Sequence, residues 1–199
     1  MTRDREATCA KILEATEQII VAQGVGSVGM NAVAAAAGVD KVLIYRYFGG
    51  REGLIREVAT RRELWPAPRG ATHGAETLGE EFAAALLDGV RSLRDQPFAR
   101  RAIGWSMSQR DEFAGAAALA RNVALRQIAE RLREHHQVPR YLDLDAFVSV
   151  LFAAVAQLGL LASDGPEEPY GALELRQGDD WRRIERMLIT IVQALCDPP

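Results

Sequence analysis

The chain is predicted to be all-α, with about nine helices. Apolar residues recur at helical spacing in nearly every segment, and glycine or proline interrupts the pattern where helices should end. No segment alternates apolar and polar residues between hairpin turns, as a β-strand would. With 199 residues, of which 48% are hydrophobic, the chain is long enough to bury a core in one or two domains.

The first helix is predicted from apolar residues at helical spacing, and Gly24 should end it. A short alanine-rich helix follows over residues 30–37, with Gly29 as its cap and Gly38 at its end. Asp40 then stands where an N-cap belongs, before a helix over residues 41–48. Gly49 and Gly50 end that helix, and the next should run from residue 51 to about 65.

The clearest break in the pattern is the segment 66–74, PAPRGATHG, in which proline, glycine and small polar residues cannot sustain a helix. It divides the chain into a helix-turn-helix domain over 1–50, a connecting helix over 51–65 and a second domain over 75–199. Helices in the second domain are expected at 75–95, 97–109, 111–136, 143–163 and 180–196.

Charge is distributed unevenly along the chain. The net charge is −3, but residues 30–62 carry six basic and three acidic residues, a local balance of +3. Contact with nucleic acid is therefore expected to be local and N-terminal. The chain has two cysteines, one near each end, which favours reduced thiols. No membrane span or signal-peptide core is expected, so the protein is predicted to be cytoplasmic.

The most informative segment runs from Val33 to Leu54, VAAAAGVDKVLIYRYFGGREGL. A short helix, a glycine turn and a second helix with basic and aromatic residues are suited to entering a DNA groove. This string resembles the DNA-binding domain of TetR/AcrR-type transcriptional regulators, and the resemblance covers residues 5–60. It implies that double-stranded DNA, with a palindromic operator, is the partner of this domain.

The resemblance also implies roles for residues of the second helix. Lys41, Tyr45, Tyr47 and Arg51 occupy phosphate-contacting positions, and the chemistry agrees, because lysine, arginine and the tyrosine hydroxyl all donate to phosphate. The positions that meet base edges hold Val42, Leu43 and Arg46. Arginine bonds guanine bidentately, and valine suits a thymine methyl group. Ile44 and Phe48 are expected to face inward.

Two departures from the family pattern affect the expected specificity. Gly29 stands where the family often has threonine, so the second helix opens without a hydroxyl for DNA. Val42 and Leu43 stand where the family favours small or polar residues. Specificity then rests on few hydrogen bonds, or Leu43 is partly buried. Both alternatives stay open.

Two segments near the C-terminus are unusually apolar: residues 146–162 carry no charge, and residues 186–196 are nearly as apolar. A helix that is hydrophobic almost all round must be covered on most of its surface. The resemblance implies a homodimer through the last two helices, which would space two recognition helices for the half-sites of a palindrome. The alternative is that both helices form the core of a monomer.

A ligand pocket among the middle helices is the other candidate site. Apolar lining with a few polar groups is typical of such pockets, although a core has the same composition. Gln157 is singled out because an unpaired amide in an apolar helix is costly. The predicted contacts are Phe82, Leu86, Trp105, Phe113, Phe147, Leu151 and Gln157, which favour a small apolar or aromatic effector.

No set of residues suggests an enzyme, a metal site or a cofactor. His135 and His136 are adjacent on a predicted helix, so they should point in different directions and interact with the helix dipole. The sequence therefore predicts a ligand-responsive, homodimeric DNA-binding regulator, most simply a repressor. The alternative is a helical small-molecule binding protein whose DNA binding is weak or non-specific.

Overall fold

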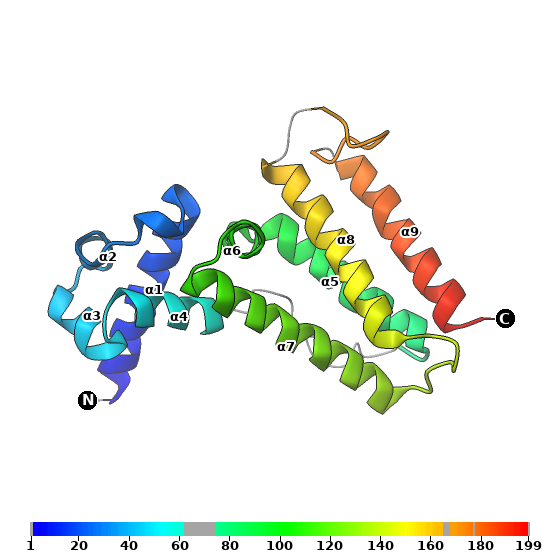
Figure 1. Ribbon diagram of the computed structural model, residues 1–199, viewed down its shortest axis with the longest axis horizontal. Helices are drawn as coiled ribbons and strands as arrows, with labels where there is room; N and C mark the ends of the chain where they lie inside the picture. The colour runs from blue at the N-terminus through cyan, green and yellow to red at the C-terminus, as the bar shows by residue number, and fades with distance from the viewer. Residues whose placement is uncertain (1, 62–74, 165–167, 177, 199) are drawn as a thin grey trace. The chain divides into compact units, whose positions relative to one another are not determined.

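A computed structural model describes residues 2–61, 75–164, 168–176 and 178–198. The described part is all-helical, with one isolated bridge between Tyr170 and Leu173 and no strand. The helices in Figure 1 are α1 (Thr2–Gln23), η1 (Val25–Ser27), α2 (Met30–Ala37), α3 (Lys41–Phe48), α4 (Arg51–Arg61), α5 (Leu78–Asp95), α6 (Pro97–Ser108), α7 (Glu112–His135), α8 (Leu144–Asp164) and α9 (Gly178–Cys196). This architecture confirms the predicted fold class.

The chain groups into two compact units. The first comprises Met1–Leu64 and Pro97–Arg121, and the second comprises Trp65–Gln96 and Asn122–Pro199. The predicted break at 66–74 lies outside the described residues. The domain limits 1–50, 51–65 and 75–199 stay a prediction, because the first unit also takes in α6 and the start of α7.

The first unit is built around one apolar core, to which the helix-turn-helix segment and α6 both contribute. Ile12 and Ile20 of α1 and Ile44 of α3 are completely buried in it, together with Leu54 of α4. Phe113, at the start of α7, joins the same cluster. Helix α3, the recognition helix of the predicted helix-turn-helix segment, therefore shares its core with α1, α4 and the start of α7. Apolar burial fixes its position within this unit.

In the second unit α5 packs against both α8 and α9. The Phe82 ring of α5 contacts Phe147 edge to face, with centroids 5.4 Å apart, and lies 6.4 Å from the ring of Phe152. The end of α9 is tied to the start of α5, because Asp197 accepts a hydrogen bond of 2.6 Å from the Thr77 hydroxyl. Both apolar C-terminal segments are thus anchored on α5.

The α8 segment Leu144–Ala162 is long and apolar enough to span a membrane by length and composition alone. Its packing is that of a helix with one covered face: Val148, Phe152 and Val155 are buried, whereas Val150 is 64% exposed. Packing against α5 accounts for the covered face. The opposite face of α8 is exposed in the single chain.

Candidate functional site

The turn between α2 and α3 is set by one glycine and one aspartate. Gly38 has a φ of 64°, in the left-handed region where only glycine is unstrained, and Val39 N donates to the Ala34 carbonyl at 3.0 Å. The Asp40 carboxylate accepts from Val42 N at 2.9 Å and so caps α3. These local interactions fix where the recognition helix begins.

The recognition helix has one face in the core and one face in solvent. Ile44 is completely buried, and Leu43 and Phe48 are half-buried. The exposed face carries Lys41, Val42, Tyr45 and Arg46, with Val42 61% and Tyr45 52% exposed. These four residues, all predicted to meet DNA, are exposed to solvent on the same face of α3. Leu43 is half-buried, in agreement with the second of the two alternatives given for it in the sequence analysis.

Tyr47 lies between the exposed and buried faces, with two guanidinium groups near its ring. The Arg46 guanidinium carbon lies 5.8 Å from the ring centroid, and that of Arg5, from α1, lies 5.3 Å from it. Both distances are within the range of a cation–π interaction. Arg5 therefore adds a cation beside the recognition helix. The sequence pattern did not identify it, because 42 residues separate it from Tyr47 and only folding brings them together.

Arg51 makes internal contacts that the sequence did not predict. Its Nε donates to the Val28 carbonyl at 2.8 Å, and its Nη2 donates to the Val25 carbonyl at 3.2 Å. The side chain thus ties α4 to the η1 turn. A guanidinium has five donors, so a phosphate contact by Arg51 stays a prediction, but positioning is the role that its geometry supports.

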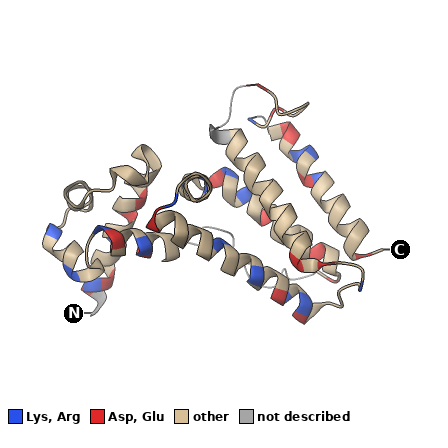
Figure 2. Ribbon diagram, viewed as in Figure 1, with Lys and Arg blue, Asp and Glu red and all other residues tan. Residues whose placement is uncertain are grey.

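Positive charge gathers on this part of the first unit. Figure 2 shows Lys and Arg on α3 and at the start of α4. Exposed lysine and arginine neutralise phosphates and release bound counterions, which is the sequence-independent part of DNA affinity. The arrangement of a capped helix, exposed cations and an exposed tyrosine is that of a helix-turn-helix reader of the major groove.

Comparison with known proteins identifies the class. Residues 12–58 match the model of the bacterial regulatory proteins of the tetR family. Residues 12–58 therefore belong to the tetR family of bacterial regulatory proteins. This is a family of regulators and not of enzymes, in agreement with the sequence prediction.

Two relatives of known sequence are similar to the chain over much of its length. One is an uncharacterised HTH-type transcriptional regulator of Mycobacterium tuberculosis, 31% identical over 131 residues, which are 59% of this chain and 63% of that protein. The matched part is thus less than two thirds of that relative. The other, the HTH-type transcriptional regulator SrpR of Pseudomonas putida, is 26% identical over 81% of this chain and 79% of its own length.

Solved structures share the fold at low sequence identity. Salmonella enterica GusR has a TM-score of 0.68 and 15% identity, covering 96% of this chain and 95% of its own. NalD of Pseudomonas aeruginosa, described as the secondary repressor of the MexAB-OprM multidrug efflux pump, has a TM-score of 0.66 and 22% identity, covering 98% of both chains. At these identities the likeness concerns the fold alone.

The structure separates the seven residues predicted to contact an effector. Phe82, Leu86, Phe147 and Leu151 lie in the second unit, where Phe82 and Leu86 are completely buried. The other aromatic pair, Trp105 and Phe113, belongs to the first unit and packs in or against its core. There the Trp105 Nε1 donates to Asp111 at 2.8 Å. No single wall made of all seven residues is formed within either unit.

Gln157 does not lie in the buried environment that was expected for it. The sequence predicted a buried amide, but Gln157 is exposed on α8. The reason is the orientation of the helix, which turns Val155 and Ala156 inward and leaves Gln157 with Ala153 and Ala154 on the uncovered face. The burial argument for Gln157 as an effector contact is therefore wrong.

The second unit has an open groove between α7 and α8, with a volume of about 540 Å³. The charged residues of this groove were not predicted from the sequence. Their spacing on α7 is that of an ordinary solvated face, and α8 contributes only two residues. The lining residues are Asn122, Leu125, Arg126, Ala129, Glu130, Arg133, Asp145 and Ser149.

The sequence predicted that His135 and His136 would point in different directions, but both side chains contact the same carboxylate. The Glu81 carboxylate of α5 lies 3.1 Å from His135 Nδ1 and 2.8 Å from His136 Nε2, and it accepts a bond of 2.7 Å from Arg131 Nε. Both rings reach this carboxylate from the end of α7, with their centroids 6.2 Å apart. This cluster is a structural tie between α5 and α7.

Proposed function

We propose that this protein is a homodimeric DNA-binding transcriptional regulator of the cytoplasm, acting as a repressor that a small molecule releases from a palindromic operator. The observation that carries the proposal is the solvent-facing side of α3, where Lys41, Val42, Tyr45 and Arg46 stand together on a capped helix. In this proposal Lys41, Tyr45, Tyr47 and Arg5 supply phosphate contacts. Arg46 and Val42 contact base edges, together with the exposed part of the Leu43 side chain.

The proposed DNA interface is tested by substitutions on α3. Tyr45→Ala and Arg46→Ala are each expected to weaken specific binding to the promoter next to the gene by about tenfold or more, because each removes a charge-assisted or base contact. The measurement is fluorescence anisotropy with the promoter fragment and a shuffled fragment at two salt concentrations. Arg110→Ala, which removes an exposed arginine outside α3, should change neither affinity.

The same assay separates the two candidate functions. Sequence-selective binding that Arg46→Ala abolishes supports the regulator. Salt-sensitive binding with equal affinity for both fragments supports the small-molecule binding protein, which the exposed aliphatic Val42 and the capping Gly29 favour. Unchanged selective binding in both variants contradicts the proposed interface.

The proposed homodimer rests on apolar side chains left uncovered on the two C-terminal helices. Val150 of α8 is 64% exposed, and Met187 and Leu195 of α9 are 58% and 41% exposed. Ala153 and Ala154 are exposed on the same helix as Val150 and permit close approach of another helix. An apolar face of this kind is typical of an interface between subunits.

Met187→Asp is expected to convert the dimer to a monomer that keeps its helical content, because an unpaired carboxylate in an apolar interface is costly. Sedimentation equilibrium at micromolar concentration measures the change, with circular dichroism as the folding check. Thr190→Ser, a mild change at an exposed position of α9, is the control and should leave the dimer intact. A monomeric unsubstituted protein would contradict the proposal.

A further inference from the structure

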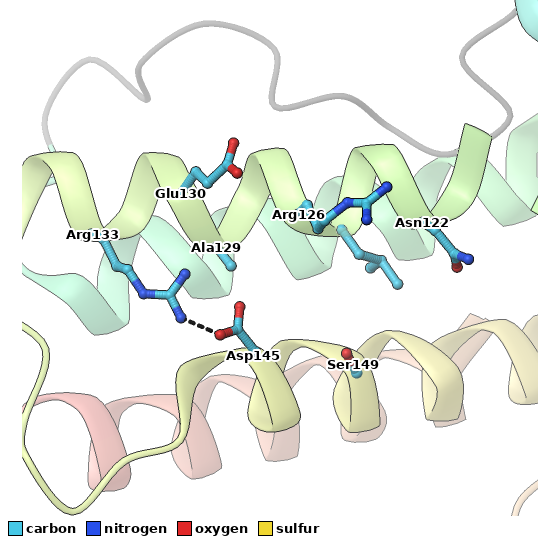
Figure 3. A pocket seen from close by; sticks show the side chains of 8 residues that line it. Asn122, Arg126, Ala129, Glu130, Arg133, Asp145 and Ser149 are labelled. Carbon is cyan, nitrogen blue, oxygen red and sulfur yellow. Dashed lines mark hydrogen bonds and ion pairs between the residues drawn. The ribbon is translucent and has the colours of Figure 1, made fainter. Parts of the chain in front are cut away.

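The groove between α7 and α8 has the features of a small-molecule site. Its volume of about 540 Å³ is within the range of pockets that hold drug-sized ligands. Leu125, which lines it, is half-buried and supplies an apolar surface, whereas Ala129 beside it is 2% exposed. Asn122 from α7 and Ser149 from α8 point into the space between the helices (Figure 3).

The charges of the groove are arranged asymmetrically. At one end Arg133 of α7 is ion-paired with Asp145 of α8, so these two charges neutralise each other (Figure 3). Glu130 lies on α7 with its carboxylate directed away from α8 (Figure 3). Further along α7, Arg126 lies one turn from Asn122 and makes no ion pair to a described residue. The open half of the groove therefore carries a positive charge.

We infer that this groove binds an amphipathic organic anion, a molecule with an apolar or aromatic body and one carboxylate or sulfonate. The body would cover Leu125, and the anionic group would accept from the Arg126 guanidinium, the Asn122 amide and the Ser149 hydroxyl. A guanidinium with two neutral donors suits one planar or tetrahedral anion. A neutral apolar molecule would make none of these three polar contacts.

This inference specifies the effector of the proposed regulator, and its regulatory meaning rests on that function. The groove adjoins the uncovered face of α8, since Ser149 directly precedes Val150. A ligand held between α7 and α8 would therefore act next to the residues proposed to form the dimer. Ligand binding would bias the dimer geometry to the extent that the two states bind it unequally.

The test uses 8-anilinonaphthalene-1-sulfonate as the probe, because it joins an aromatic body to one sulfonate. N-phenyl-1-naphthylamine has the same rings without the sulfonate and serves as the neutral probe. Fluorescence titration of the full chain is expected to give one site per chain for the anion. Arg126→Ala should lower the affinity for the anionic probe by about tenfold and leave the affinity for the neutral probe unchanged. Ser149→Trp, which fills the groove, should lower the affinity for both probes. Arg140→Ala, an exposed arginine outside the groove, should affect neither.

The result that overturns the inference is equal affinity of the anion for Arg126→Ala and the unsubstituted chain. Unchanged binding of both probes to Ser149→Trp, checked as folded by circular dichroism, would also overturn it. Neither measurement involves DNA. If the protein binds the anion through Arg126 but binds no promoter, only the proposed regulatory function is contradicted. If it binds the promoter but not the anion, only the proposed ligand site in the groove is contradicted.

Discussion

Phe82→Ala is expected to destabilise the second unit by about 3–5 kcal/mol, the usual cost of removing a buried phenylalanine. The side chain is completely buried. Its ring contacts Phe147 edge to face at 5.4 Å and lies 6.4 Å from the ring of Phe152. The substitution removes both aromatic contacts and leaves a cavity that α5 and α8 can only partly close. Urea unfolding followed by circular dichroism measures the change.

The effect of Phe82→Ala also decides between two roles for this residue. The sequence predicted Phe82 as a ligand contact, and a wall residue facing an open pocket would lose little stability on truncation. The packed ring predicts a large loss of stability. Val123→Ala, at an exposed position of α7, is the control and should cost less than about 0.5 kcal/mol. Near-normal stability of Phe82→Ala, with a weakened effector response, would restore the ligand role and contradict the packing argument.

The helices were predictable because their limits depend on local chemistry. Gly24, Gly38 and Gly49 end helices, each with a positive φ, and Asp40 caps α3 through its own carboxylate. The exposed face of α3 was predictable for the same reason, since Ile44 occupies the inward position of an eight-residue helix. A single sequence carries these signals within a few residues of where they act.

What could not be predicted depends on which distant residues meet. The Arg51 contacts to Val25 and Val28, like the Arg5 position beside Tyr47, require the packed first unit. The direction of Gln157 depends on how α8 is rotated against α5, and an almost uniformly apolar helix gives no periodicity from which to read that rotation. The groove along α7 was not predicted for a different reason, since its charged residues have the spacing of an ordinary solvated face.

The cluster around Glu81 is the strongest case of this kind, and Glu81→Leu is expected to destabilise the second unit by about 3 kcal/mol. Its carboxylate is 8% exposed and is contacted by His135, His136 and Arg131. Leucine would remove the acceptor that these three side chains share at a largely buried position. The expected value lies at the low end of the range for buried pairs, because the His135 side chain is 44% exposed. Glu134→Gln, an exposed position on the same stretch of α7, is the control and should be nearly neutral.

The pH dependence of stability provides a second, independent measurement on Glu81. Burial of this carboxylate opposes ionisation and raises its pKa, but hydrogen bonds from His136, His135 and Arg131 outweigh burial, so the pKa lies below its ordinary value of 4.5. A carboxylate with a lowered folded-state pKa contributes stability that is fully present above the unfolded value and is lost as pH falls through the folded value. The contribution of Glu81 should therefore be complete at neutral pH and decline only below about pH 4.5.

Glu81→Gln isolates that contribution, because glutamine keeps the shape of the side chain but carries no charge. The difference in unfolding free energy between the unsubstituted protein and Glu81→Gln is expected to shrink as the pH falls below about 4.5. Urea unfolding at a series of pH values measures it. A difference that stays constant or grows below about pH 4.5 would mean that the folded-state pKa of Glu81 is not lowered, and the three donors would then not hold Glu81 as the ionised centre of the tie between α5 and α7.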